Sequence, residues 1–202
     1  MPEKLIDKMQ DLNRRIRIKG AIYGSVLGVI ILALHIFSYY MMVKISTPLW
    51  VTAFSPLIFT NIIPIIAAVL LCLRFREKIG GHWHLRQAAS GIFVMFLTSY
   101  LIFFFGFLLF SKVIEPATDI NLQNKIESVK AAIRKGQGVS QQHINEETAG
   151  LRKDYIDRQK SGVWGFVQSF GIVVVLLFLA SLIFGALFKN ELLQPVPVNK
   201  KQ

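Results

Sequence analysis

The sequence has little of what most catalytic and metal sites need. It contains one cysteine, Cys72, and four histidines in 202 residues. A single cysteine excludes an internal disulfide and any metal site built from several cysteines. His82 and His84 are two positions apart in a loop with no cysteine nearby, which is a weak pattern for zinc. We therefore expect no catalytic residue, no metal and no cofactor.

Acidic residues are also few. Twelve Asp and Glu stand against 23 Lys and Arg, which gives a formal net charge of +11. A net positive charge of this size is common in nucleic-acid-binding proteins, but no sequence signature of a nucleic-acid-binding fold occurs in the chain. The cations instead flank long apolar stretches, where they set membrane orientation and meet anionic headgroups. We expect membrane lipids, and no nucleic acid, as partners.

Four apolar stretches dominate the chain, at about Gly20–Val43, Leu49–Leu73, Ala88–Phe110 and Val163–Phe188. A hydrocarbon core of roughly 30 Å needs about 20 helical residues, and each stretch reaches that length. Backbone groups in lipid must be hydrogen-bonded within the protein. The stretches do not alternate polar with apolar residues, as the strands of a membrane barrel do. The sequence therefore predicts an all-α integral membrane protein with four transmembrane helices.

The distribution of Lys and Arg predicts the orientation. Six precede the first span, four lie between the second and third, and three follow the fourth, whereas the first-to-second loop has only Lys44. We expect residues 1–19 and the tail 189–202 in the cytoplasm of a bacterial inner membrane, with spans one to three at 20–110 and span four at 163–188. Residues 111–162 are expected on the other side of the membrane.

Basic and aromatic residues gather at the predicted span ends. Residues 1–19 have the spacing of an amphipathic helix, whose cations either set topology or contact anionic lipid or a partner. Tryptophan at a span end suits headgroup depth, because one side of the indole is apolar and the other polar. The predicted lipid-headgroup contacts are Arg14, Arg15, Arg17, Lys19, Trp50, Trp83 and Trp164.

Small residues recur one helical turn apart in two spans. They are Gly20, Gly24 and Gly28 in the first span, and Ser181 with Gly185 in the fourth. The glycines continue into no Gly-Lys-Ser, so they form no nucleotide-binding loop. Small residues at this spacing let helix backbones approach closely in a membrane. They predict tight packing on a neighbour within the chain or in another subunit, and we favour the internal neighbour.

His35 is the only acidic or basic side chain within the four spans. It lies seven residues beyond Gly28, so we expect it to face the bundle, either in a functional role or as a neutral histidine hydrogen-bonded to a neighbour. Asn61 is the obvious candidate for that neighbour. Pro64 removes a backbone hydrogen bond and predicts a kink near Asn61. A binding site at this break is the alternative to a purely structural role.

Residues 111–162 predict an αα-hairpin. One amphipathic helix begins near Thr118 and ends at Gly136-Gln-Gly138, and Ser140 opens a second helix. The apolar stripes of the two helices must cover each other, the bundle, lipid or a partner. Coverage of one stripe by the other is the favoured arrangement.

Several motifs together resemble those of one uncharacterised family. They are the Lys19-Gly-x-x-x-Gly24-x-x-x-Gly28 start of span one, Gly80-Gly81 before span three and Glu115-Pro116 before the hairpin. In these the chain resembles the domain-of-unknown-function family numbered 4199, small four-helix membrane proteins found mainly in Bacteroidota. Such proteins are often encoded near membrane glycosyltransferases. The resemblance implies an accessory role in envelope glycan or lipid assembly and brings no catalytic residue.

Three functions are compatible with these features. We expect a non-enzymatic scaffold or accessory subunit of an envelope complex, partnered by another membrane protein, such as a glycosyltransferase, or by a second copy of the chain. One alternative is a small transporter or channel subunit that uses His35 and Asn61 at mid-membrane depth. The other is a membrane enzyme acting on lipid-linked substrates, for which the chain shows no positioned nucleophile and base.

Overall fold

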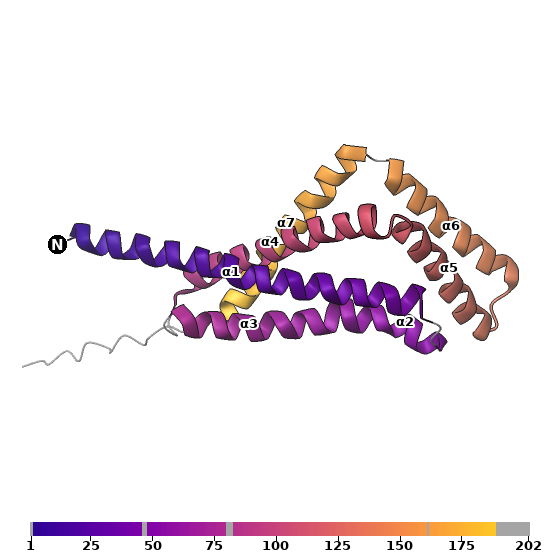
Figure 1. Cartoon of the computed structure of the whole chain (residues 1–202), viewed down its shortest axis with the longest axis horizontal. Coiled ribbons are helices and arrows are strands. Elements are labelled where there is room, and N and C mark those ends of the chain that lie inside the picture. The colour runs from indigo at the N-terminus through magenta and orange to yellow at the C-terminus, as the bar shows by residue number, and fades with distance from the viewer. Residues whose placement is uncertain (1, 46–47, 80–82, 161, 189–202) are drawn as a thin grey trace, which may run out of the picture.

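A computed structural model describes residues 2–45, 48–79, 83–160 and 162–188, and every regular element in them is helical (Figure 1). The predicted turn at Gly80-Gly81, the residue His82 and the tail 189–202 lie outside the described residues. The side chain of Trp164 lies outside them as well.

The first half of the chain forms two long helical rods. Helix α1 (Pro2–Val43) is a single helix of 42 residues, so the basic segment and the first span are continuous. The second rod consists of α2 (Leu49–Leu57), the π-helical turn η1 (Ile58–Ile62) and α3 (Ile63–Ile79). The other elements are α4 (Leu85–Leu109), the π-helical turn η2 (Phe110–Ile114), α5 (Thr118–Gly136), α6 (Gln141–Lys160) and α7 (Gly162–Phe188).

Four of these helical segments are long and apolar enough to cross a membrane. They are Gln10–Val43, Leu49–Ile79, Leu85–Ile114 and Val167–Phe188. Each exceeds the roughly 20 residues that a bilayer requires. The predicted fold class, an all-α multi-pass membrane protein, is confirmed.

The bundle has two distinct ends (Figure 1). The N-terminal part of α1, the end of α3, the start of α4 and the end of α7 gather at one end, which we call the basic end. The α5–α6 hairpin lies at the other end. There, Lys44 Nζ lies 3.0 Å from Glu115 Oε1, which joins the end of α1 to the end of η2. This hydrogen bond raises the pKa of the Lys44 ammonium.

Helices α1 and α4 form the centre of the bundle and run parallel. A Cβ atom built on Gly20 would lie 2.6 Å from the carbonyl oxygen of Gly91, and one on Gly28 would lie 2.8 Å from that of Ser99. Gly24, between them, meets the backbone of Met95. The three glycines therefore face α4 of the same chain, at a distance that leaves no room for a side chain.

The buried core lies where α1, α3 and α4 meet, close to the basic end. Its members include Ile16, Leu27, Cys72, Phe75, Trp83, Ile92 and Met95. The rings of Phe75 and Trp83 meet edge to face with centroids 5.2 Å apart. Trp83 is only 3% exposed, and its Nε1–H donates to the carbonyl oxygen of Phe188 over 2.8 Å. The predicted headgroup contact of Trp83 is therefore wrong, because this indole caps the end of α7 inside the bundle.

The hairpin closes on itself through paired charges as well as apolar contacts. Ile144 of α6 is buried, and Gly138 makes the turn with φ of 77°, which glycine adopts at no steric cost. Arg134 Nη2 lies 2.8 Å from Glu147 Oε1, and Arg152 Nη2 lies 2.8 Å from Glu127 Oε2. The hydrogen bond from Arg152 lowers the pKa of the Glu127 carboxyl.

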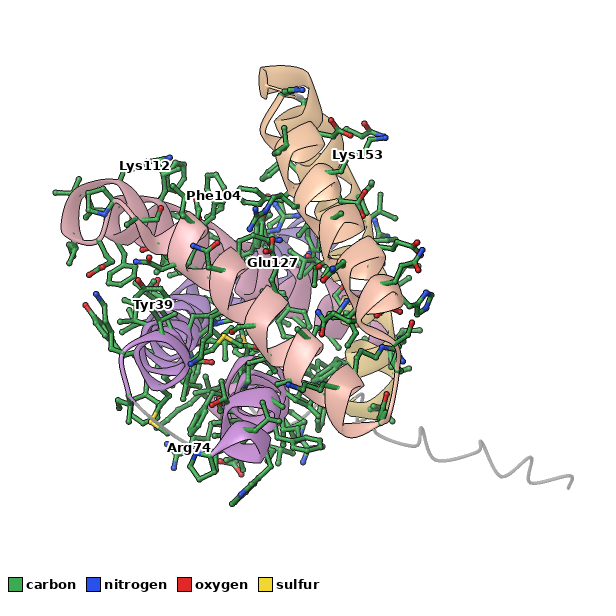
Figure 2. All side chains as sticks on the ribbon, turned by 90° about the vertical axis from the view of Figure 1, so that its right-hand side faces the viewer. Tyr39, Arg74, Phe104, Lys112, Glu127 and Lys153 are labelled. Atoms are coloured by element: carbon green, nitrogen blue, oxygen red, sulfur yellow. The ribbon has the colours of Figure 1, made fainter. Side chains whose placement is uncertain are left out.

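Helix α5 also lies across the hairpin end of the bundle, as Figure 2 shows from that end. Its first residues are held by Thr118, whose buried Oγ1 donates to the Glu115 carbonyl oxygen over 2.6 Å. Further along, Asn121 Nδ2 donates to Tyr39 Oη of α1 over 3.5 Å. The hairpin is thus attached to the bundle through α5.

Candidate functional site

The second rod changes its helical geometry between two prolines. Pro56 and Pro64 flank η1, and the N–H of Ile63 donates to the carbonyl oxygen of Ile58, five residues back. Proline cannot donate to the carbonyl four residues earlier, and a wider π-helical turn absorbs that loss. Thr60 Oγ1 donates to the Pro56 carbonyl oxygen over 2.6 Å, so the hydroxyl is satisfied within the turn. The irregular turn lies at the position where the sequence predicts a kink.

A groove of about 350 Å³ opens beside η1. Its walls come from α1, η1, α3, α4 and α7 and are mostly apolar. The polar residues in the lining are Thr60, Asn61, Ser99 and Tyr100. Because these walls belong to membrane-spanning helices, the groove faces the hydrocarbon region. We call it the η1 groove.

Asn61 is the most polar residue of the η1 groove, and it is exposed there. Its Nδ2 donates to Thr60 Oγ1 over 3.0 Å, and within the described part of the chain its side chain makes no other hydrogen bond. An amide has two N–H donors and one carbonyl acceptor, and leaving such groups unpaired in hydrocarbon costs several kcal/mol, about 2–7 by transfer data. The amide is therefore positioned for a polar group that enters the groove.

His35 does not share this site. Its Nδ1 lies 3.1 Å from the carbonyl oxygen of Ile31, one turn earlier in α1. Its ring packs on Phe103 of α4, with centroids 4.4 Å apart. The structure thus satisfies His35 locally and does not pair it with Asn61, contrary to the expected hydrogen bond between the two. A mid-membrane site built jointly from these residues has no geometric support.

The basic residues of α1 divide into two groups. Arg14, Arg15 and Arg17 are exposed at the basic end, and Arg15 Nη2 lies 2.8 Å from Asp11 Oδ2 in the preceding turn. Lys19, by contrast, donates to the carbonyl oxygen of Lys78 in the last turn of α3. That ammonium satisfies a carbonyl that the helix itself leaves unpaired. Lys19 therefore joins two helices, a role that its place in a basic run does not indicate.

Among the predicted interface tryptophans, Trp50 is 68% exposed on α2, in contrast to the buried Trp83. The small residues of the fourth span lie against α4 and within α7. A Cβ on Gly185 would lie 3.0 Å from the backbone nitrogen of Ala89. Ser181 is fully buried, and its Oγ donates to the Phe178 carbonyl oxygen over 2.7 Å. The close approach at Gly185 holds the second half of α7 against α4, whereas the hydrogen bond of Ser181 stays within α7.

The sequence indicated the surface that receives the glycines only in part. The third span offers small residues at Ser90, Gly91, Ser99 and Gly106, but nothing in the sequence assigns them to the glycines of the first span. The structure places Gly91, Met95 and Ser99 against Gly20, Gly24 and Gly28. Met95 is not a small residue, so small-residue spacing alone did not predict this pairing. Of the residues that the structure describes, no three His, Cys, Asp or Glu side chains lie close enough together to hold a metal ion.

Comparison with known proteins identifies the family. The family model described as protein of unknown function (DUF4199) matches residues 22–190, which is most of the chain. The chain therefore belongs to this family. No curated protein and no solved structure matches it.

Proposed function

We propose that this member of the DUF4199 family is a non-enzymatic accessory subunit whose η1 groove receives a transmembrane helix of another membrane protein. The observation that carries the proposal is the Asn61 amide, exposed in an apolar groove with a single hydrogen bond. Polar side chains in membrane helices associate helices through hydrogen bonds, each contributing about 0.6–2 kcal/mol. A partner helix with a polar residue at this depth supplies the missing bonds.

The open form of the groove supports a helix as the occupant. Its walls come from several helices, with Ile65 from α3 and Leu177 from α7 among the lining residues. Van der Waals packing drives association in lipid, so a groove with walls on several helices gives an incoming helix more contact area than a flat face does. A membrane glycosyltransferase is the first partner to test, because the resemblance to the family implies it.

Cross-linking from the groove tests the proposal. A photo-reactive residue in place of Leu177, which lines the groove, should cross-link in intact membranes to one other membrane protein. Ile183 is 61% exposed on another face of α7 and serves as the matched control position. Asn61→Leu should lower the cross-linked fraction from position 177 by about 3- to 10-fold, the effect of losing about 0.6–1.4 kcal/mol.

Three outcomes would count against the accessory-subunit proposal. Equal yields from positions 177 and 183 would show that contact is random. Products that contain only lipid would leave the groove without a protein occupant. A product that contains only two copies of this chain would make the protein a self-associating one instead.

We also propose that the protein lies in a bacterial inner membrane with the basic end in the cytoplasm and the hairpin outside. The support is the distribution of Lys and Arg in the short segments next to the spans. The long segment 111–162 carries nine Lys and Arg beside seven Asp and Glu, and segments of that length cross a membrane largely regardless of charge. Arg74, Arg76, Lys78 and Arg86 join the cations of α1 at the basic end, whereas Lys44 at the hairpin end is paired with Glu115. Unpaired Lys and Arg near short loops favour the cytoplasmic side. Both termini are then cytoplasmic.

Cysteine labelling tests this orientation. In a Cys72→Ser background, Gln137→Cys at the tip of the hairpin should react with a membrane-impermeant maleimide added to intact spheroplasts. Asn13→Cys near the start of the first span should react only after the membrane is opened. Labelling of both positions in intact spheroplasts, or of Asn13→Cys alone, would overturn the proposed topology.

A further inference from the structure

We propose that one anionic phospholipid binds at the basic end on the membrane-facing side of α4, with its phosphate between Arg17 and Arg86 and an acyl chain between α4 and α7. This site is separate from the η1 groove and does not depend on the accessory role. It consists of two adjoining hollows, one polar and one apolar.

The polar hollow has a volume of about 320 Å³ and lies between α1 and α4. Asn13 and Arg17 of α1 line it together with Arg86 and Gln87 of α4 and with His84, the residue before α4. No acidic residue is in this lining, and neither arginine forms an ion pair within the described ranges. Two free guanidinium groups from different helices give a phosphate charge-assisted hydrogen bonds, and guanidinium geometry suits phosphate.

The apolar hollow has a volume of about 480 Å³ and lies between α4 and α7. Leu85, Ala89 and Phe93 line it from α4, and Phe178 and Leu182 from α7. The rings of Phe93 and Phe178 meet edge to face with centroids 5.9 Å apart, so they form a fixed apolar wall. At about 1.5 Å per residue, Phe93 is roughly 10 Å deeper along α4 than Arg86, well inside one leaflet.

Arg86 and Ser90 line both hollows, so the two hollows adjoin at these residues of α4. Their position four residues apart places them on one face of α4, between the α1 side and the α7 side. A soluble anion would use the polar hollow alone, and an apolar helix would use the apolar hollow alone. An anionic phospholipid uses both, since it carries a phosphate at headgroup depth and hydrocarbon directly below it.

Native mass spectrometry of the full chain, released from detergent after incubation with defined lipids, tests the site. Phosphatidylglycerol should be retained at least about tenfold more than phosphatidylcholine with the same acyl chains. Arg86→Gln and Arg17→Gln should each lower retention of phosphatidylglycerol by about tenfold, the expected effect of losing a hydrogen bond to a charged group. Glycerol phosphate, which has the head and no chain, should bind at least tenfold more weakly than the lipid.

Arg74→Gln is the matched control, because it removes one positive charge from the basic end at an exposed residue of α3 that lines neither hollow. It should leave lipid retention unchanged. Equal loss of retention in Arg74→Gln and Arg86→Gln would show that retention follows net charge. Equal retention of the two lipids would show that the site does not recognise the anionic headgroup. Glycerol phosphate binding as tightly as the lipid would reassign the polar hollow to a soluble anion. Unfolding curves of the variants show whether a variant has lost lipid binding or has failed to fold. Ser90→Leu places a larger side chain at a residue that lines both hollows, so it should also lower retention of phosphatidylglycerol.

Discussion

Gly24→Ala should lower the free energy of unfolding by about 3 kcal/mol, at the upper end of the range for overpacked sites. The added Cβ would lie 2.9 Å from the Cβ of Thr98 and closer still to the carbonyl oxygen of Met95. The Met95 oxygen belongs to the backbone of a regular helix, so it cannot turn away as a flexible side chain does. The substitution can be accommodated only if α1 and α4 separate along the seam that the three glycines form.

Gly171→Ala is the matched control for Gly24→Ala. Apart from its chain neighbours and its own helix backbone, no atom lies within 4 Å of a Cβ built at Gly171, which is also in a membrane-spanning helix. Alanine has a helix propensity about 1 kcal/mol better than that of glycine, so this change should be neutral or stabilising. Unfolding of both variants in lipid bicelles, measured by steric trapping, provides the comparison. Equal destabilisation of the two would show that the seam is not closely packed.

Trp83→Ala should cost about 3–5 kcal/mol of unfolding free energy, the usual cost of truncating a large buried aromatic side chain. The indole packs on Phe75 and donates to the carbonyl oxygen of Phe188. Its loss therefore leaves a cavity beside Phe75 and leaves the Phe188 carbonyl oxygen without this donor. Trp83→Phe retains most of the ring and loses the donor, which should cost about 1 kcal/mol. The same bicelle assay measures both variants.

Trp50→Ala supplies the comparison for Trp83→Ala. Trp50 is 68% exposed, so its removal should change the unfolding free energy by no more than about 0.5 kcal/mol. Similar decreases in unfolding free energy for Trp50→Ala and Trp83→Ala would contradict the burial of Trp83. A large decrease in unfolding free energy for Trp83→Ala, with no decrease for Trp83→Phe, would show that Trp83 stabilises the protein through packing and not through its hydrogen bond to the end of α7.

The sequence predicted individual residues of the candidate site but not how they are arranged. Asn61 and Pro64 stand out as an amide and a proline in an apolar run, and the structure places an irregular helical turn there. Their surroundings did not follow from the sequence. The groove needs Leu177 of α7 beside Asn61, and no local pattern relates residues so far apart. The expected pairing of Asn61 with His35 failed because a helical histidine can bond to a carbonyl one turn earlier, as His35 does with Ile31.

By itself, the sequence determined that the chain is helical, where its four spans run and where the hairpin turns. These properties depend on local composition, since a bilayer demands about 20 apolar residues with internal hydrogen bonds and Gly138 permits the turn. Only the tertiary structure decided which apolar surface is protein core and which faces lipid. The physical reason is that lipid chains and a protein core are equally apolar, so hydropathy does not separate the buried Trp83 from the exposed Trp50. The packing of the helices did separate them, because α3 and α7 place Phe75 and the Phe188 carbonyl oxygen against Trp83.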